Sequence, residues 1–229
     1  MEPSYGRSHH YIGDDGVRYF AKQNIGKVIG AELDAAKFAP HIRNGDSVLD
    51  FGCGGGFTLK TLCCQRRIGV EINPAAQEVA RQNGLECYAD LAEIPSAVAD
   101  VAISNHALEH VPNPLQALRE LHRTLRPEGT LVLVVPIDDW RTQRHFHRDD
   151  IDHHLYTWSP QLLGNCLVEA GFDPSRVAIR VLSHAWFPGY VRAYRLLPLV
   201  VFNALCSFHS ILVKRRQLIA IARKQLVSG

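Results

Sequence analysis

The 229-residue sequence predicts a doubly wound α/β fold: a mostly parallel seven-stranded sheet with helices on both faces and a helical insertion before the last strand. Short apolar runs alternate with helix-compatible segments through short turns, which is typical of parallel strands joined by crossing helices. The run Ser47 to Phe51 leads into four glycines in the five positions from Gly52 to Gly56. Ligands of such sheets bind outside the carboxyl ends of the strands, so this loop marks the expected site.

Seven apolar runs are expected to form the strands, namely 48–51, 67–73, 85–89, 100–104, 130–135, 176–182 and 217–223. Helices are expected between them over 57–62, 75–83, 115–125 and 160–170, and a turn is expected over Arg126 to Gly129. Apolar residues at helical spacing from Gly16 to Ile42 predict one or two further helices before the first strand. Residues 1–12 have no periodicity and predict a flexible or substrate-covering arm.

The length favours a single domain, 1–229, in four parts. These are an N-terminal helical cover (1–43), a binding core (45–182), an insertion (183–216) and the last strand (217–224). Lys+Arg 25 against Asp+Glu 23 gives a net charge of +2, which disfavours nucleic acid as a partner. Six cysteines without a CxxC pair, and no signal peptide, predict a reduced, cytoplasmic chain.

The glycine loop indicates a nucleotide-type pocket, because glycines let the backbone approach a ligand and the following helix presents free amides. The dinucleotide pattern GxGxxG would need glycine at Phe57 or Leu59, and the Gly-Lys-Ser/Thr of a phosphate loop is absent. What remains is an acid, Asp50, two residues before a Gly-x-Gly-Gly-Gly turn. An ordinary tight connection between strand and helix is the alternative interpretation.

The stretch from Asp50 to Gly56 resembles the first motif, Asp-x-Gly-x-Gly-x-Gly, of the class I S-adenosylmethionine-dependent methyltransferases. The stretch Ser104 to Pro114, followed by Leu-Arg-Pro-Glu-Gly, resembles the small-molecule branch of these enzymes. The resemblance covers about residues 45 to 136. It implies a Rossmann-like methyltransferase fold, S-adenosyl-L-methionine as cofactor, and cofactor contacts from Asp50, Gly52, Cys53 and Gly54.

Glu71 ends the second apolar run, about twenty residues after the glycine loop. A carboxylate has two acceptor oxygens for the two hydroxyls of a ribose, so Glu71, with Ile72 beside it, is predicted to bind the cofactor. The resemblance implies that Asp90 faces the adenine amino group and that Leu91 packs on the ring. The alternative for Asp90 is a cap on the turn that follows it.

The resemblance also places Asn105 and His106 near the transferred methyl group. His106 and His154 are the candidate general bases, and the alternative for His106 is a structural role at the end of a strand. Glu109 and His110 are expected to brace the loop and start the next helix.

Residues 145–154 hold four histidines and three aspartates. We expect no metal site there, because no helical HxxxH pair is present and methyl transfer needs no metal unless a diol acceptor is to be ionised. Recognition of the acceptor is the favoured role of this segment. The candidate contacts are His153, His154, Tyr156 and Trp158, and the alternative is that they pack a short extended segment.

Residues 196–213 are the most apolar run of the chain. A helix there would have one narrow polar stripe, at Asn203, Ser207, Ser210 and Lys214, and would need two apolar neighbours. The run is marginal for spanning a bilayer, and arginines and a lysine flank it. Three roles stay open for 190–216: a lid over the acceptor, a homodimer contact, or peripheral membrane contact with a lipid-linked acceptor.

The predicted function is therefore transfer of a methyl group from S-adenosylmethionine to an O or N atom of a small-molecule, sugar or lipid-linked acceptor. The alternative is a nucleoside-binding or S-adenosylmethionine-binding regulatory or scaffold protein without turnover. Transfer of a labelled methyl group to any acceptor separates the two.

Overall fold

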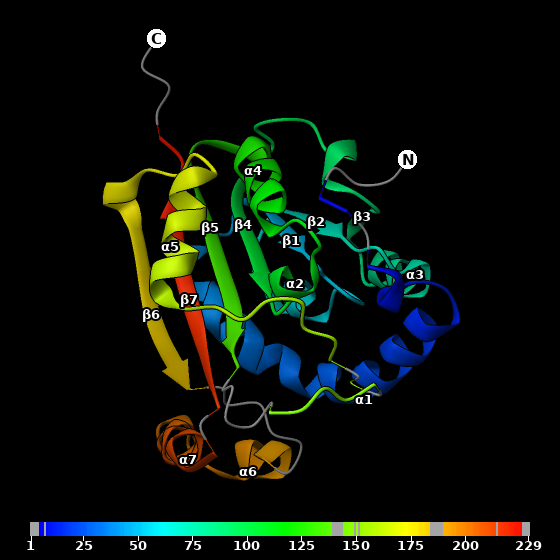
Figure 1. Ribbon diagram of the computed structural model, residues 1–229, viewed down its shortest axis with the longest axis vertical. Coiled ribbons are helices and arrows are strands. Elements are labelled where there is room, and N and C mark those ends of the chain that lie inside the picture. Colours follow the sequence, from blue (N-terminus) through cyan, green and yellow to red (C-terminus); the bar gives the residue numbers. More distant parts are fainter. Residues whose placement is uncertain are drawn as a thin grey trace.

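Seven strands form one sheet in the order β3-β2-β1-β4-β5-β7-β6, with only β7 antiparallel to its neighbours β5 and β6 (Figure 1). The strands are β1 (Ser47–Phe51), β2 (Arg66–Val70), β3 (Glu86–Tyr88), β4 (Ala99–Asn105), β5 (Leu125–Ile137), β6 (Val177–Ser183) and β7 (Arg216–Arg223). The computed structural model describes residues 5, 6, 8–138, 144–148, 150, 152–183, 190–213 and 215–225, and for 22–29, 190 and 191 it describes the backbone alone. The predicted fold class is confirmed.

Helices cover both faces of the sheet. Alternate residues of β5 enter two separate cores, as the period of a strand requires: Leu131 and Leu133 face one, Val132 and Val134 the other. The first core is completed by α4 (Pro114–Thr124) and α5 (Pro160–Glu169). The second is completed by α1 (Gly13–Phe38), α2 (Phe57–Thr61) and α3 (Pro74–Gln82). The chain is therefore a three-layer α/β/α structure.

The glycine loop joins β1 to α2 as predicted. Gly52, Gly54 and Gly56 have φ of 76°, 53° and 74°, in the left-handed region that side chains disfavour. A Cβ at Gly52 would also lie 2.3 Å from the Cβ of Ala107, which follows β4. The glycines are therefore required both for the turn and for the close approach of two loops at the carboxyl edge of the sheet.

The N-terminal helical segment is one long α-helix, α1, followed by a short 3₁₀ turn at Ala39–His41. The expected turn Arg126 to Gly129 lies within the bounds of β5 as a bulge, because the ladder with β4 passes from the pair Ala99–Leu125 to the pair Val101–Thr130. The described part of the N-terminal arm packs on the body, since Tyr5 is only 2% exposed.

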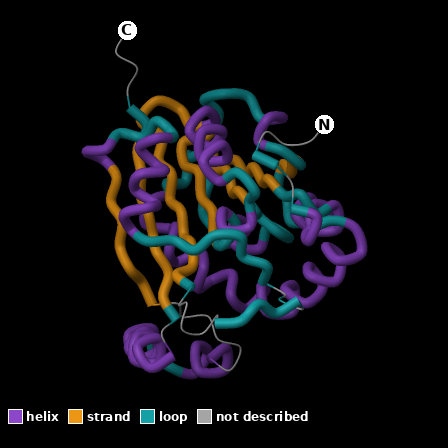
Figure 2. Tube along the Cα trace, in the orientation of Figure 1, coloured by secondary structure: helices purple, strands orange, loops and turns teal. Residues whose placement is uncertain are grey.

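Two helices, α6 (Tyr190–Leu196) and α7 (Leu199–Val213), form the insertion between β6 and β7. Figures 1 and 2 show them below the sheet, beyond the carboxyl ends of β4 and β5, and the hydroxyl of Tyr194 on α6 donates to Glu32 on α1 at 3.4 Å. Among the described residues, no helix is long and apolar enough to cross a membrane.

Candidate active site

The carboxyl ends of β1, β2 and β4 bring the predicted cofactor residues together at one edge. Strand pairing aligns Phe51 with Val70, so the glycine loop leaves β1 beside the point where Glu71 leaves β2. The amides of Gly52 and Cys53 both donate to the carbonyl of Val70, at 2.8 and 3.1 Å. These bonds tie the loop to the neighbouring strand.

Glu71 lies at the mouth of the glycine loop. Its Oε2 accepts the Gly54 amide at 2.9 Å and its Oε1 accepts the Asn73 amide at 2.8 Å. The side chain is half-buried, and a carboxylate oxygen can accept more than one hydrogen bond. The geometry orients both oxygens and is consistent with a role in binding the two hydroxyls of a ribose.

Asp50 and Cys53 lie deeper, buried at the end of β1 and at the start of the loop, whereas Ile72 is half-buried beside Glu71. A hydrogen bond with the Cys87 thiol and burial raise the pKa of the Cys53 thiol. Cys53 is therefore a neutral thiol under the loop, and it contributes packing and backbone amides rather than charge.

Asp90 and Leu91 follow β3. Asp90 caps the 3₁₀ turn Leu91–Glu93, since its Oδ1 accepts the Ala92 amide at 3.0 Å, as the alternative interpretation expected. Leu91 is fully buried in the core, and its amide donates to the hydroxyl of Tyr5 at 3.4 Å. Contacts of Asp90 and Leu91 with an adenine ring stay a prediction.

Asn105 ends β4, His106 follows it, and the two side chains are held by different elements. The ammonium of Lys37 on α1 donates to Asn105 Oδ1 at 3.0 Å. His106 has a φ of 54° and its Nε2 lies 2.9 Å from Gln217 Oε1 on β7. Because the Gln217 amide group donates to the carbonyl of Ser183, its Oε1 is the acceptor and His106 Nε2 carries the proton. This network favours a positioning role for His106.

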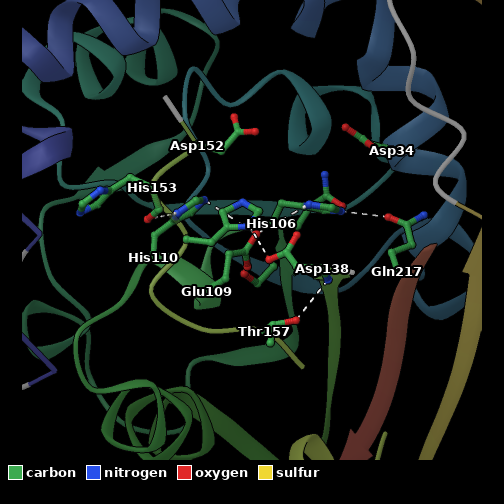
Figure 3. Close-up of polar contacts among 12 residues, drawn as sticks. Asp34, His106, Glu109, His110, Asp138, Asp152, His153, Thr157 and Gln217 are labelled. Atoms are coloured by element: carbon green, nitrogen blue, oxygen red, sulfur yellow. Dashed lines mark hydrogen bonds and ion pairs between the residues drawn. The ribbon is translucent and has the colours of Figure 1, made fainter. Parts of the chain in front are cut away.

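A second group of polar side chains surrounds the buried carboxylate of Glu109, which lies in the 3₁₀ turn Leu108–His110 (Figure 3). Its Oε1 is 3.7 Å from His106 Nδ1 and 3.8 Å from His110 Nε2. The segment 152–158 crosses this turn, because the amides of Leu155 and Tyr156 both donate to the carbonyl of Glu109. That crossing brings His154 to the cluster, with its ring centroid 5.0 Å from that of His110.

Hydrogen bonds orient the rings of His110 and His154. Tyr11 donates its hydroxyl proton to the carbonyl of Asp152 at 2.6 Å, so it accepts from His110 Nδ1, also at 2.6 Å. His154 Nδ1 lies 2.8 Å from Asp138 Oδ2, just past β5, where the Asp138 amide donates to Thr157 Oγ1. Each ring is thereby left with Nε2 as its unprotonated nitrogen when it is neutral.

The two histidines have opposite pKa shifts. Burial, with the neighbouring His154, lowers the pKa of His110 to about 3. Burial alone would also lower the pKa of His154, but the hydrogen bond and charge of Asp138, with Glu109 nearby, outweigh it and raise that pKa above its ordinary value. His154 is therefore the stronger base and the group that can hold a proton beside Glu109, while His110 stays neutral.

The sequence missed Glu109, His110, Asp138 and Tyr11 as members of the site. Glu109 and His110 were predicted only to brace the loop, and the backbone bonds of Glu109 do brace the segment 152–158. Of the other predicted acceptor contacts, His153 stacks on His10 with centroids 4.6 Å apart, and Tyr156 donates to the carbonyl of Pro112. Trp158 is 3% exposed and belongs to the core.

Glu109, His110 and His154 could also hold a metal ion, because one ligand atom from each lies within 4.8 Å of the others. Imidazole and carboxylate suit zinc and similar ions. A protonated His154 beside the Glu109 carboxylate accounts for the same arrangement without a metal ion. The expected absence of a metal site stays a prediction, tested below.

Comparison with known proteins finds methyltransferases. A family model described as a methyltransferase domain matches residues 22–176. Over 97 residues the chain is 33% identical to the ubiquinone biosynthesis O-methyltransferase of Vibrio campbellii, a match that covers 37% of this chain and 41% of that protein. A match to an uncharacterised transposon protein of Streptomyces fradiae is 37% identical over 111 residues and covers 43% of this chain and 32% of that protein. The chain therefore spans less than half the length of these curated relatives.

Solved structures show the same fold. A SAM-dependent methyltransferase from Thermotoga maritima superposes with a TM-score of 0.68 at 15% identity, covering 91% of this chain and 97% of that one. A phosphoethanolamine N-methyltransferase from Haemonchus contortus, in complex with S-adenosylhomocysteine, gives a TM-score of 0.64 at 13% identity, covering 95% and 58%.

Proposed function

The chain belongs to the family of methyltransferase domains, and on that premise we propose that it transfers a methyl group from S-adenosylmethionine to a small-molecule acceptor. Of the O and N acceptor atoms that the sequence allows, the proposal favours a hydroxyl oxygen. A hydroxyl must lose its proton to become a good nucleophile, whereas a neutral amine already has a lone pair. The observation that carries this choice is the hydrogen bond between His154 and Asp138.

The residues at the β1–β2 edge fit the cofactor. The glycine loop leaves the backbone open to a ligand, and Glu71 presents two oriented acceptor oxygens where a ribose diol would bind. The loop residues Gly52 to Gly54, with Ile72, Asp90, Leu91 and Asn105 around them, would hold the rest of the molecule. When bound, S-adenosylmethionine supplies an electrophilic methyl group on a positively charged sulfur.

The protein then has two tasks, to orient the acceptor and to remove its proton. Asp138 fixes the tautomer of His154 by accepting its Nδ1–H, which leaves Nε2 to accept the hydroxyl proton. The imidazolium formed is stabilised by Asp138 and by the buried carboxylate of Glu109, both of which raise its pKa. His106, bonded to Gln217, positions the loop between the two regions.

A labelled-methyl transfer assay tests the proposed function. Purified protein and S-adenosylmethionine with a labelled methyl group are incubated with fractionated cell extract, and the label is followed into extractable products. The expected result is an acceptor labelled through a base-stable ether bond. Binding of the cofactor by calorimetry without transfer to any fraction would instead support a binding protein without turnover.

A further inference from the structure

The helix α7 touches the body of the protein along one narrow stripe. Its buried residues are Phe202, Cys206 and Ser210, which are spaced four apart and so lie on a single line of the helix. The Phe202 ring packs against Tyr194 of α6 with centroids 5.2 Å apart. The α6 helix thus supplies one of the two apolar neighbours that such a helix needs.

The rest of α6 and α7 exposes an apolar surface that we call the insertion face. Val200 is 81% exposed, Phe208 63% and Leu212 66%. The full set of large exposed apolar residues on this face is Leu196, Leu199, Val200, Val201, Leu205, Phe208, Ile211, Leu212 and Val213. Monomeric soluble proteins rarely expose so much contiguous apolar surface, so the insertion face has a partner.

The charge around the insertion face is positive. Arg192 and Arg195 are exposed on α6, and Arg215 and Arg216 are exposed just after α7. From Pro174 to Gly229 the sequence has nine Lys and Arg and no Asp or Glu. An apolar helix flanked by arginines matches a membrane surface, where the apolar side chains enter the acyl boundary and the cations meet anionic headgroups.

We propose that the insertion face docks on the surface of an anionic lipid membrane. A second copy of the chain is a poorer partner, because a symmetric contact would bring the same arginines of both copies together. Spanning the bilayer is excluded for α7 by its length, since 15 residues reach about 22 Å against a hydrocarbon core of about 30 Å. The helix therefore lies in the interface.

A chain of hydrogen bonds connects the insertion face to the candidate active site. The hydroxyls of Ser210 on α7 and Ser183 are hydrogen-bonded at 2.9 Å, and the Ser183 carbonyl accepts from Gln217, which in turn accepts from His106. Docking would place the carboxyl edge of the sheet toward the membrane (Figure 1). If the proposed methyl transfer holds, the acceptor is amphiphilic and reaches the site from the lipid surface.

Vesicle sedimentation tests the docking. The intact protein is spun with phosphatidylcholine vesicles with and without phosphatidylglycerol, at low and high salt. We expect it to pellet with the anionic vesicles and to be released by salt. Protein that stays in the supernatant with anionic vesicles at low salt overturns the proposal.

Two double variants sharpen this test. Phe208→Ser with Leu212→Ser should weaken the partition onto anionic vesicles by at least about tenfold, because both side chains are exposed in the free protein. Arg192→Gln with Arg195→Gln should weaken it by about 30-fold at low salt. The matched controls, Leu162→Ser on α5 and Arg18→Gln with Arg119→Gln, remove exposed groups elsewhere and should not change it.

Two further measurements separate docking from other outcomes. Calorimetry with S-adenosylmethionine on the same variants should give unchanged affinity, so failure of docking and failure of the cofactor site are distinguished. Analytical ultracentrifugation without lipid should show a monomer. A dimer that dissociates when Phe208 and Leu212 are replaced would assign the insertion face to self-association and overturn the membrane proposal.

Discussion

At the scale of single residues, the groups next to each histidine determine its pKa. His110 and His154 have rings 5.0 Å apart, yet their pKa values move in opposite directions. Asp138 is the cause of the difference, because its carboxylate bonds His154 directly, while His110 bonds a hydroxyl that carries no charge at neutral pH. Burial and the neighbouring acids raise the pKa of Tyr11 and keep that hydroxyl protonated.

Replacing His154 tests its role as the proton acceptor. His154→Ala should lower turnover by about a hundredfold and leave cofactor affinity intact, because only the proton transfer is lost. Wild-type turnover should fall as the pH drops through the raised pKa of His154, and Asp138→Asn should move that fall to lower pH. The turnover of His106→Ala, which removes a positioning residue, is compared with that of His154→Ala. Near-normal turnover of His154→Ala across the pH range would leave catalysis to orientation alone.

The buried neutral His110 predicts acid sensitivity of folding. Below its ordinary pKa of about 6.5 the unfolded chain binds a proton at His110, and the folded protein does not until about pH 3, so stability falls as the pH drops through this window. His110→Gln should therefore lose about 2 kcal/mol less than wild type between pH 6.5 and 5 in denaturant titrations. The exposed His145→Gln is the control. Equal losses in wild type and His110→Gln would contradict the buried neutral histidine.

Removal of metal tests whether the cluster around Glu109 holds a proton on His154 or binds a metal ion. Dialysis against a chelator should leave turnover and thermal stability unchanged, since Asp138 and Glu109 favour a proton on His154. Loss of turnover that manganese or zinc restores would show that Glu109, His110 and His154 bind a metal instead.

At the scale of elements, the sequence predicts the strands better than the site. All seven strands overlap the apolar runs that predicted them. For the central strands β1, β4 and β5 the reason is that both faces are buried, so the runs are nearly continuous. The start of β5 was not predicted, since Arg126 to Gly129 has turn residues and Glu128 has a φ of 65°. The ladder with β4 passes from the pair Ala99–Leu125 to the pair Val101–Thr130, so the residues between them bulge out of the pairing and Glu128 keeps a left-handed, turn-like backbone.

The cluster around Glu109 could not be predicted from spacing. His154 lies 44 to 45 positions from Glu109 and His110, and it reaches them only because backbone bonds from Leu155 and Tyr156 fasten its segment to the turn. The spacing of residues along the sequence does not indicate that this segment crosses the turn. By contrast, the position of Glu71 beside the glycine loop was predictable, because the carboxyl ends of adjacent parallel strands meet at one edge.

The glycine loop provides a prediction at this scale. Gly54→Val should abolish cofactor binding, because a branched side chain cannot adopt a φ of 53° without strain and would crowd the ligand's approach. Gly45→Ala is the control, since no atom lies within 4 Å of the added Cβ. Calorimetry on both folded variants is the measurement. Tight binding by Gly54→Val would remove the loop from the cofactor site.

At the scale of the whole molecule, two groups of candidate site residues lie at separate positions along the carboxyl edge of the sheet. The carboxyl ends of β1 and β2 hold the glycine loop and Glu71, and the carboxyl end of β4 leads to the histidine cluster, with α6 and α7 beyond this edge (Figure 1). The apolar insertion was predicted from composition, but its exposure was not, because only the fold shows that one line of α7 meets the body. The arrangement supports the proposed transfer of a methyl group from a nucleoside cofactor at one end of this edge to an acceptor at the other.

Calorimetric titration of S-adenosylmethionine into wild type and Glu71→Ala tests the central claim most directly. Glu71 is placed to bind the ribose diol and also holds the Gly54 amide, so its removal should cost about 1.5 to 3 kcal/mol of binding free energy in a folded protein. Glu71→Gln, which keeps one acceptor oxygen, should fall between the two. Equal affinity in wild type and a folded Glu71→Ala variant would contradict the assignment of the cofactor site.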